Sequence, residues 1–214
     1  MLGLAIHTSS PQLGLMLQSV APDPGEGIER YQVWDLGREV SSHLHVKLVE
    51  FIAPHSWQDL SFIAVDKGPG GFTGTRIGVV AARTLAQQLK IPLFGVSSTA
   101  ALAACATLGD EPGGKDIAIA MPAKREAVFG AIYRPNSDGD LQPVLEDEVI
   151  PVDKWNQILA NRERPVEQVT TEIGEGIAES VTGVMAIAYV RWMQGQRPGW
   201  ESVMPFYGQH PVNR

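Results

Sequence analysis

A glycine-rich stretch, residues 67–78, limits the possible folds of this chain more than any other feature of the sequence. It reads Lys-Gly-Pro-Gly-Gly-Phe-Thr-Gly-Thr-Arg-Ile-Gly. The apolar run before it, 61–65, is typical of a buried strand, and the run after it, 79–90, has good helix formers and no proline. We therefore expect a strand, a sharp turn at Pro69 and a helix in direct succession.

The glycines of this turn allow two interpretations. Gly70 and Gly71 would leave backbone N–H groups free at a helix start, where phosphate groups bind, or they would let the turn pack closely against a neighbour. Known phosphate loops fit poorly, because no lysine follows Gly74 and because Thr73 stands where the dinucleotide motif has its last glycine. Close packing is therefore favoured, and nucleotide binding stays open.

Length and composition indicate an ordinary globular protein. The 214 residues are 44% hydrophobic and 19% charged, which suits one large domain or two small lobes. A polar stretch, 107–116, predicts a boundary. We expect an N-terminal lobe over 1–107 and a C-terminal lobe over 108–214.

Cysteine usage and hydropathy favour the cytoplasm. Cys105 is the single cysteine, so no internal disulfide is possible, and its apolar helical surroundings predict a buried, inert thiol. No basic segment precedes an apolar run at the N-terminus, and no apolar stretch reaches the length of a membrane span. We therefore expect neither a signal peptide nor a membrane anchor.

The order of the predicted elements indicates an α/β fold. In the first half, three strands precede a helix, a strand, a helix and a strand. The elements predicted there are strands at 2–6, 13–20, 30–36 and 61–65, a turn at 21–27 and a helix at 42–53. Those predicted in the second half are strands at 117–121, 127–133 and 144–150 and helices at 152–159 and 179–193.

Several segments resemble the TsaB (YeaZ) family. Residues 67–78 resemble its signature K/R-G-P-G-S-F-T-G-L-R-I-G, and 6–9 resemble its opening I-D-T-S. Segments 91–98, 123–129 and 205–207 resemble its I-P-L-x-G-V-S-S, D-A-R-x-x-E-V-Y and terminal P-x-Y. The resemblance is dense in the first half of the chain and thin afterwards. The glycine motif that would shape the turn comprises Gly68, Pro69, Gly70, Gly71, Phe72, Thr73, Gly74, Arg76 and Gly78.

This resemblance implies both a fold and a function. The fold would be the two-lobed actin-like ATPase fold, with a mixed five-stranded sheet flanked by helices in the N-terminal lobe and a smaller, degenerate C-terminal lobe. The protein would be a non-catalytic partner of TsaD, which transfers threonylcarbamoyl to N6 of adenosine 37 in tRNAs that read ANN codons. TsaE, an ATPase, would join through the complex, and tRNA would be contacted only within the assembly. The free protein would be able to form a homodimer, and no catalytic residue, cofactor or metal ion is expected.

Three residues depart from the family pattern. His7 stands in place of the Asp of I-D-T-S, which in actin-like ATPases directs the metal ion, and histidine is not an equivalent ligand for Mg²⁺. Pro122 and Ala127 replace the acidic residues of D-A-R-x-x-E. Functions that depend on those acidic groups are therefore doubtful, whereas the glycine motif is untouched.

Other enzymatic sites are poorly supported. His43 and His45 are two residues apart and so lie on different sides of a helix, while His55 and His210 have no clear partner. No G-x-S-x-G nucleophile motif occurs. Two alternatives stay open: a divergent kinase or glycopeptidase-type metalloenzyme of the same fold, and a nucleotide sensor that uses the glycine turn.

Two helices are candidates for a partner surface. The helix at 42–53 has a wide apolar arc, which indicates either deep burial or a second apolar contact. The helix at 72–89 has a small-residue face, and we expect its valines to point the other way. The two could form half of a four-helix bundle with a partner. The residues expected at this interface are Val46, Val49, Ala53, Arg76, Val79, Val80, Arg83 and Ala86.

The charge of the chain predicts weak binding to nucleic acid. Its formal net charge is −7, and phosphate neutralisation by Lys and Arg drives most nucleic-acid binding. We expect the free protein not to bind tRNA tightly at about 0.15 M salt. Filter binding measures this, and a submicromolar affinity that falls steeply with added salt would contradict the prediction.

Overall fold

The structure is a computed structural model that describes residues 1–20, 29–107, 114–172, 176–206 and 208. The predicted turn at 21–27, most of the boundary stretch at 107–116, Tyr207 and His210 lie outside these residues.

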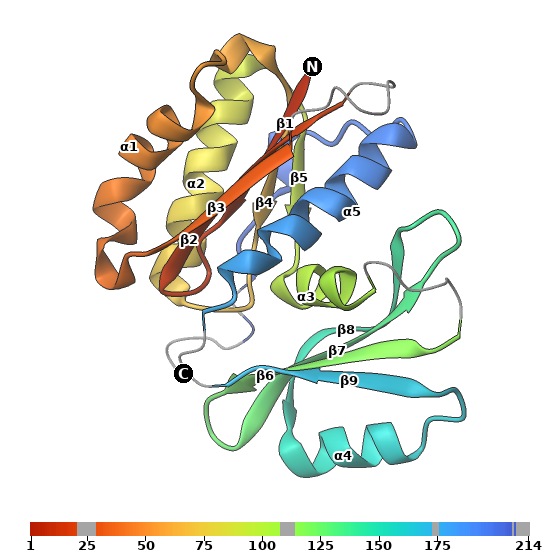
Figure 1. Cartoon of the computed structure of the whole chain (residues 1–214). Helices are drawn as coiled ribbons and strands as arrows, with labels where there is room; N and C mark the ends of the chain where they lie inside the picture. Colours follow the sequence, from red (N-terminus) through yellow and green to blue (C-terminus); the bar gives the residue numbers. More distant parts are fainter. Residues whose placement is uncertain (21–28, 108–113, 173–175, 207, 209–214) are drawn as a thin grey trace.

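A mixed five-stranded sheet forms the first half, in the order β3-β2-β1-β4-β5 (Figure 1). Its strands are β1 (Leu2–His7), β2 (Gln12–Ser19), β3 (Glu29–Asp35), β4 (Leu60–Asp66) and β5 (Leu93–Val96). The first three strands are antiparallel neighbours, whereas β1, β4 and β5 run parallel. This is the sheet expected for the N-terminal lobe of an actin-like fold.

Alternation along the strands places one apolar set on each face of this sheet. Leu4 and Ile63 pack with α1 (Val40–Ile52) and α2 (Phe72–Leu89) in one core cluster. On the other face lie α3 (Ser98–Ala106) and α5 (Val181–Met193), which share a second core cluster with the second sheet. Helices therefore cover both faces of the first sheet, as Figure 1 shows.

The end of α1 is held by the edge strand β3. Arg30 donates hydrogen bonds to the carbonyls of Phe51 and Ala53, the latter at 2.8 Å. The last carbonyls of a helix have no partner within it, so a cation there is favourable. The helix cannot continue past this point, because Pro54 follows Ala53.

The second sheet has the strand order β8-β7-β6-β9, and α4 (Val152–Ala160) covers its outer face (Figure 1). Its strands are β6 (Asp116–Ala123), β7 (Ala127–Pro135), β8 (Leu141–Pro151) and β9 (Val166–Thr170). Strand β9, which is short and pairs in parallel with β6, was not predicted from the sequence.

The chain returns to the first sheet after β9. Helix α5 packs against β1, β2 and β4 and also against α3. Beyond it, Val203 is buried in the core of the first sheet, and the backbone N–H of Phe206 donates to the carbonyl of Lys67 at 2.7 Å. The division into 1–107 and 108–214 stays a proposal, and it separates α5 by sequence from the sheet that it covers.

Two further features bear on the expectations from sequence. Among the described residues, no helix is both long and apolar enough to cross a membrane. Cys105 is half-buried rather than fully buried, with its sulfur 3.4 Å from the hydroxyl of Thr182. The expectation of a buried thiol is therefore only partly correct, because α5 covers one side of α3 at this point and leaves the other side accessible.

Candidate functional site

The glycine motif packs around the loop that follows β1. A Cβ atom at Gly70 would overlap the carbonyl of Ser9, and one at Gly74 would overlap the carbonyl of Thr8. At Gly78 a Cβ atom would meet the hydroxyl of Thr8, which donates to the carbonyl of Gly74 at 2.8 Å. Glycine is needed at these positions because the backbones of α2 and the loop approach so closely.

Two N–H groups of the turn already have partners within the protein. Gly71 donates to the carbonyl of Ser9 at 2.5 Å, and Gly68 donates to the carboxylate of Asp66 at 2.7 Å. Gly68 also has a φ of +89°, which side chains other than glycine rarely adopt. These contacts favour the packing interpretation of the motif over phosphate binding.

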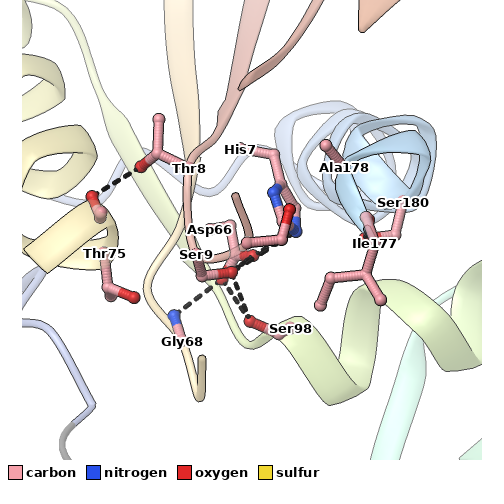
Figure 2. Close-up of polar contacts among 12 residues, drawn as sticks. His7, Thr8, Ser9, Asp66, Gly68, Thr75, Ser98, Ile177, Ala178 and Ser180 are labelled. Carbon is pink, nitrogen blue, oxygen red and sulfur yellow. Dashed lines mark hydrogen bonds and ion pairs between the residues drawn. The ribbon is translucent and has the colours of Figure 1, made fainter. Parts of the chain in front are cut away.

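Asp66, the last residue of β4, is the centre of a buried polar network (Figure 2). Its carboxylate accepts hydrogen bonds from His7 Nε2 at 2.7 Å, Ser9 Oγ at 2.5 Å and Ser98 Oγ at 2.7 Å. Together with the bond from Gly68, this makes four donors. None of the four side chains in the network is more than 2% exposed.

The network keeps the carboxylate charged. Burial alone would raise the pKa of Asp66, but the charge of His7 and the hydrogen bonds from His7, Ser9 and Ser98 outweigh it, so the pKa is lowered. The other ring nitrogen of His7, Nδ1, is buried and has no hydrogen-bond partner among the described residues. The ionised Asp66 thus joins the end of β1, the end of β4 and the start of α3.

The same residue types form hydrolase triads, but this arrangement differs from one. In a triad the serine hydroxyl is bonded to histidine, which in turn is bonded to aspartate. Here both serine hydroxyls donate to Asp66, and Ser9 Oγ is 3.5 Å from His7 Nε2. The arrangement of hydrogen bonds in this network is therefore not that of a triad, and both serine side chains are buried.

The site does not fit the magnesium nucleotide that an actin-like fold implies. His7 occupies the end of β1, and the neighbouring carboxylate of Asp66 is already satisfied by four donors. In the part of the chain that the structure describes, no group of three or more His, Cys, Asp or Glu residues could hold a metal ion. The ring of His43 lies at the surface beside Ser42 and the carbonyl of Glu39.

A second buried carboxylate connects the two sheets. Asp147 of β8 accepts hydrogen bonds from Ser97 at 2.9 Å and from Thr99, both at the start of α3. Burial raises the pKa of Asp147 despite these bonds, and burial likewise raises the pKa of Tyr133, whose hydroxyl lies 2.9 Å from Thr99 Oγ1. This cluster ties the second sheet to the N-terminus of α3.

A cavity of about 710 Å³ lies between the first turns of α1 and α2 and the facing end of the second sheet. Pro122 and Phe129, from the segment that resembles D-A-R-x-x-E-V-Y, contribute to its wall. Arg38 and Glu172 are the charged residues among the lining residues that the structure describes. The cavity lies beside the glycine motif, because Gly70, Gly71 and Gly74 also line it.

The outer faces of α1 and α2 carry exposed valines. Val46, Val49 and Val80 are 51%, 59% and 61% exposed. Ala53 and Arg76 are also exposed. These five residues, which we call the docking face, are part of the surface expected from the sequence.

For two residues of that expected surface the prediction was wrong. Val79 and Ala86 are fully buried, because α2 turns these positions, together with Gly78 and Ala82, toward the sheet. Arg83 is half-buried, and residues near the C-terminal end hold it in place. Its guanidinium lies 5.3 Å from the centre of the Trp200 ring and 3.1 Å from the sulfur of Met204.

The Asp66 network was not predicted from the sequence. A signal was present, since Asp66 is a charged residue that directly follows the apolar run 61–65 and precedes the glycine motif. Its partners His7 and Ser98 are 59 and 32 positions away along the chain, so their convergence depends on strand order rather than on local pattern. The same holds for Asp147 and α3.

Comparison with known proteins shows the family to which the chain belongs. The family model described as TsaD, tRNA N6-adenosine threonylcarbamoyltransferase, matches residues 49–190. A protein of Bacillus subtilis (strain 168) named tRNA threonylcarbamoyladenosine biosynthesis protein TsaB is 34% identical over 154 residues, which are 71% of this chain and 64% of that protein. The chain belongs to the TsaB (YeaZ) branch of this family.

Further relatives agree with this assignment. The TsaB protein of Buchnera aphidicola subsp. Schizaphis graminum is 38% identical over 92 residues, which are 43% of each chain. The chain thus spans less than two thirds of the length of these two curated relatives. The solved structure of YeaZ from Pseudomonas aeruginosa matches 96% of this chain and 100% of that chain with a TM-score of 0.70 and 22% identity, which shows the fold.

The Asp66 network predicts large and coupled effects of mutation. Asp66→Asn removes a charge that four donors share, and His7→Asp places two carboxylates together, so each should lower the free energy of unfolding by about 3 kcal/mol or more. The exchanged pair His7→Asp with Asp66→His restores opposite charges and should recover part of this loss. Urea unfolding measures each value.

The surface pair Lys47–Glu50, whose charged atoms are 2.8 Å apart, provides the control, because Lys47→Gln should cost less than about 1 kcal/mol. The sign of the pH effect follows from the lowered pKa of Asp66. Its contribution is fully present above the unfolded pKa of 3.8 and is lost as the pH falls below it, a loss that Asp66→Asn should not show. If the free-energy costs of His7→Asp and Asp66→His simply add in the exchanged pair, the two residues are not coupled.

Proposed function

We propose that this protein is a non-catalytic subunit that binds a TsaD-type threonylcarbamoyltransferase in the biosynthesis of tRNA threonylcarbamoyladenosine. The observation that carries the proposal is the docking face, which presents exposed valines on two adjacent helices while the polar centre of the molecule is sealed. The names of the curated relatives support the pathway. The buried state of His7, Ser9, Asp66 and Ser98 supports a role without catalysis.

The spacing of the exposed residues suits helix-to-helix contact. On α1 the exposed positions include 42, 46 and 49, with 53 directly after the helix, and on α2 they include 76, 80, 84 and 87. Both series repeat every three or four residues, so each forms a single stripe along its helix. Two stripes side by side can receive an equivalent pair of helices from a partner as a four-helix bundle.

Size and charge on this face favour association. Val46, Val49, Ala53 and Val80 are small and uncharged, so helices can approach closely. Arg76 is the charged member of the docking face, and its guanidinium lies 5.2 Å from the centre of the Phe72 ring. A partner with an acidic edge would complement it better than a second copy would, since two copies would bring like charges together.

The wider assembly follows from the same proposal. TsaD would bind at the docking face, TsaE would join through the complex, and tRNA would be contacted only within it, in a cytoplasmic setting. A homodimer through the docking face would be the form without TsaD. The divergent kinase or metalloenzyme considered from the sequence has no observation in its favour, because the carboxylate at the strand ends is already satisfied.

The absence of catalysis is open to direct test. The purified protein with Mg²⁺ and ATP should release no phosphate above the rate of a blank in a steady-state assay. The reasons are His7 at the end of β1 and the use of the Gly71 N–H within the protein. Turnover that disappears on mutating His7 or Gly70 would show that the protein is an ATPase.

The docking face predicts the effect of charge on association. Val80→Glu and Val49→Glu, tested separately, would each bury an unpaired charge and should weaken association with TsaD by about 3 kcal/mol, while the thermal melt of the monomer stays unchanged. Sedimentation with and without TsaD measures this.

A matched control is Val152→Glu, an exposed valine on α4 that is far from the docking face in sequence and 39% exposed. It should associate like the unmodified protein. If Val80→Glu and Val49→Glu both remain folded and bind with unchanged affinity, the interface lies elsewhere.

A further inference from the structure

The cavity between the two sheets has the size of a small-molecule site. Its volume of about 710 Å³ falls within the range of roughly 300–1,000 Å³ that is typical of ligand pockets. One wall comes from the loop after β1 and the first turns of α1 and α2, and the other comes from β6, β7 and the segment after β9. It therefore lies at the carboxyl ends of β1 and β4, where open α/β sheets bind ligands.

The cavity is poorly suited to a polyphosphate. The Gly71 N–H, which would face a phosphate, is bonded to Ser9, and the carboxylate of Asp66 is saturated and fully buried. Glu172 on the opposite wall carries a negative charge and has an interaction of its own. A nucleotide triphosphate would therefore meet the negative charge of Glu172, and neither the Gly71 N–H nor the Asp66 carboxylate would be available to it or to its magnesium ion.

An apolar group fits the cavity much better. Six of its 19 lining residues have large apolar side chains, whose burial against a ligand is favourable. These are Phe72, Ile77, Met121, Pro122, Phe129 and Ile177.

One end of the cavity is positive. Arg38 lies just before α1, is exposed, and makes no ion pair with any residue that the structure describes. The hydroxyls of Ser10 and Thr73 belong to the same wall. The N-termini of α1 and α2 lie at this wall too, and their partial positive charge adds to that of Arg38.

We propose that this cavity binds an organic anion with an apolar body, in which a carboxylate, sulfonate or phosphate monoester pairs with Arg38 and the apolar part packs against Met121, Phe129 and Ile177. None of the five residues of the docking face lines the cavity, and the proposal does not depend on the proposed function. The ligand would not bind to Asp66, because the carboxylate of that residue is already hydrogen-bonded within the protein.

Fluorescence of anilinonaphthalene sulfonate, an aromatic sulfonate, reports on binding directly. The free protein should show saturable binding, and octanoate should displace the probe at least about tenfold better than octanol, because only octanoate offers a charge-assisted bond to Arg38. Arg38→Gln should remove most of this difference. Thr73→Trp, which places a large side chain at the cavity wall, should block the probe and octanoate alike.

Matched variants separate the cavity from other surfaces. Lys154→Gln removes an exposed cation on α4 that does not line the cavity, and Thr84→Trp adds the same indole three turns further along α2; both should leave binding unchanged. Val80→Glu places a charge on the docking face. Loss of probe binding in Val80→Glu but not in Thr73→Trp would put the probe on the docking face and overturn the proposal.

Two further outcomes would also overturn it: no saturable binding, or equal displacement by octanoate and octanol in the unmodified protein. Binding to TsaD is measured in parallel for Arg38→Gln and should be unaffected. Failure of the cavity proposal is thereby distinguished from failure of the proposed function, which concerns Val49 and Val80.

Discussion

The structure depends on the carboxylate of Asp66 at the end of β4. It is fully buried and ionised, and such a group is stable only when it is fully hydrogen-bonded. Its donors come from β1, the loop after β1, the glycine turn and the start of α3, so satisfying one charge brings four segments together. The close approach of α2 to the loop after β1, which requires Gly70, Gly74 and Gly78, follows from that convergence.

The two sheets are joined on one side and separated on the other. Asp147 binds the first turn of α3, and Arg191 of α5 pairs with Asp140 near the β7–β8 turn at 3.2 Å. Near the starts of α1 and α2 the facing walls instead enclose the cavity. The molecule thus combines a buried polar network, a largely apolar cavity and a pair of helices with exposed valines.

Much of the fold was predictable from local pattern. The strands at 2–6, 13–20 and 61–65 and the helix at 152–159 agree with the structure to within about a residue at most ends. β9 was missed because its five residues are only partly buried and do not alternate clearly. The docking face was predicted in part: Val46, Val49 and Val80 are exposed, whereas Val79 and Ala86 are not, since the small-residue stripe does not specify the rotation of α2 closely enough.

By itself, the sequence determined the glycine turn, the alternation of strands and helices, and the family, because each of these depends on residues that are close together along the chain. Only the tertiary structure decided what His7 does. As a sequence position it is a histidine where the family pattern has aspartate, but in the fold it binds a carboxylate on the neighbouring strand. Parallel pairing of β1 and β4 creates that contact across 59 positions, and no local pattern encodes which distant strand becomes the neighbour.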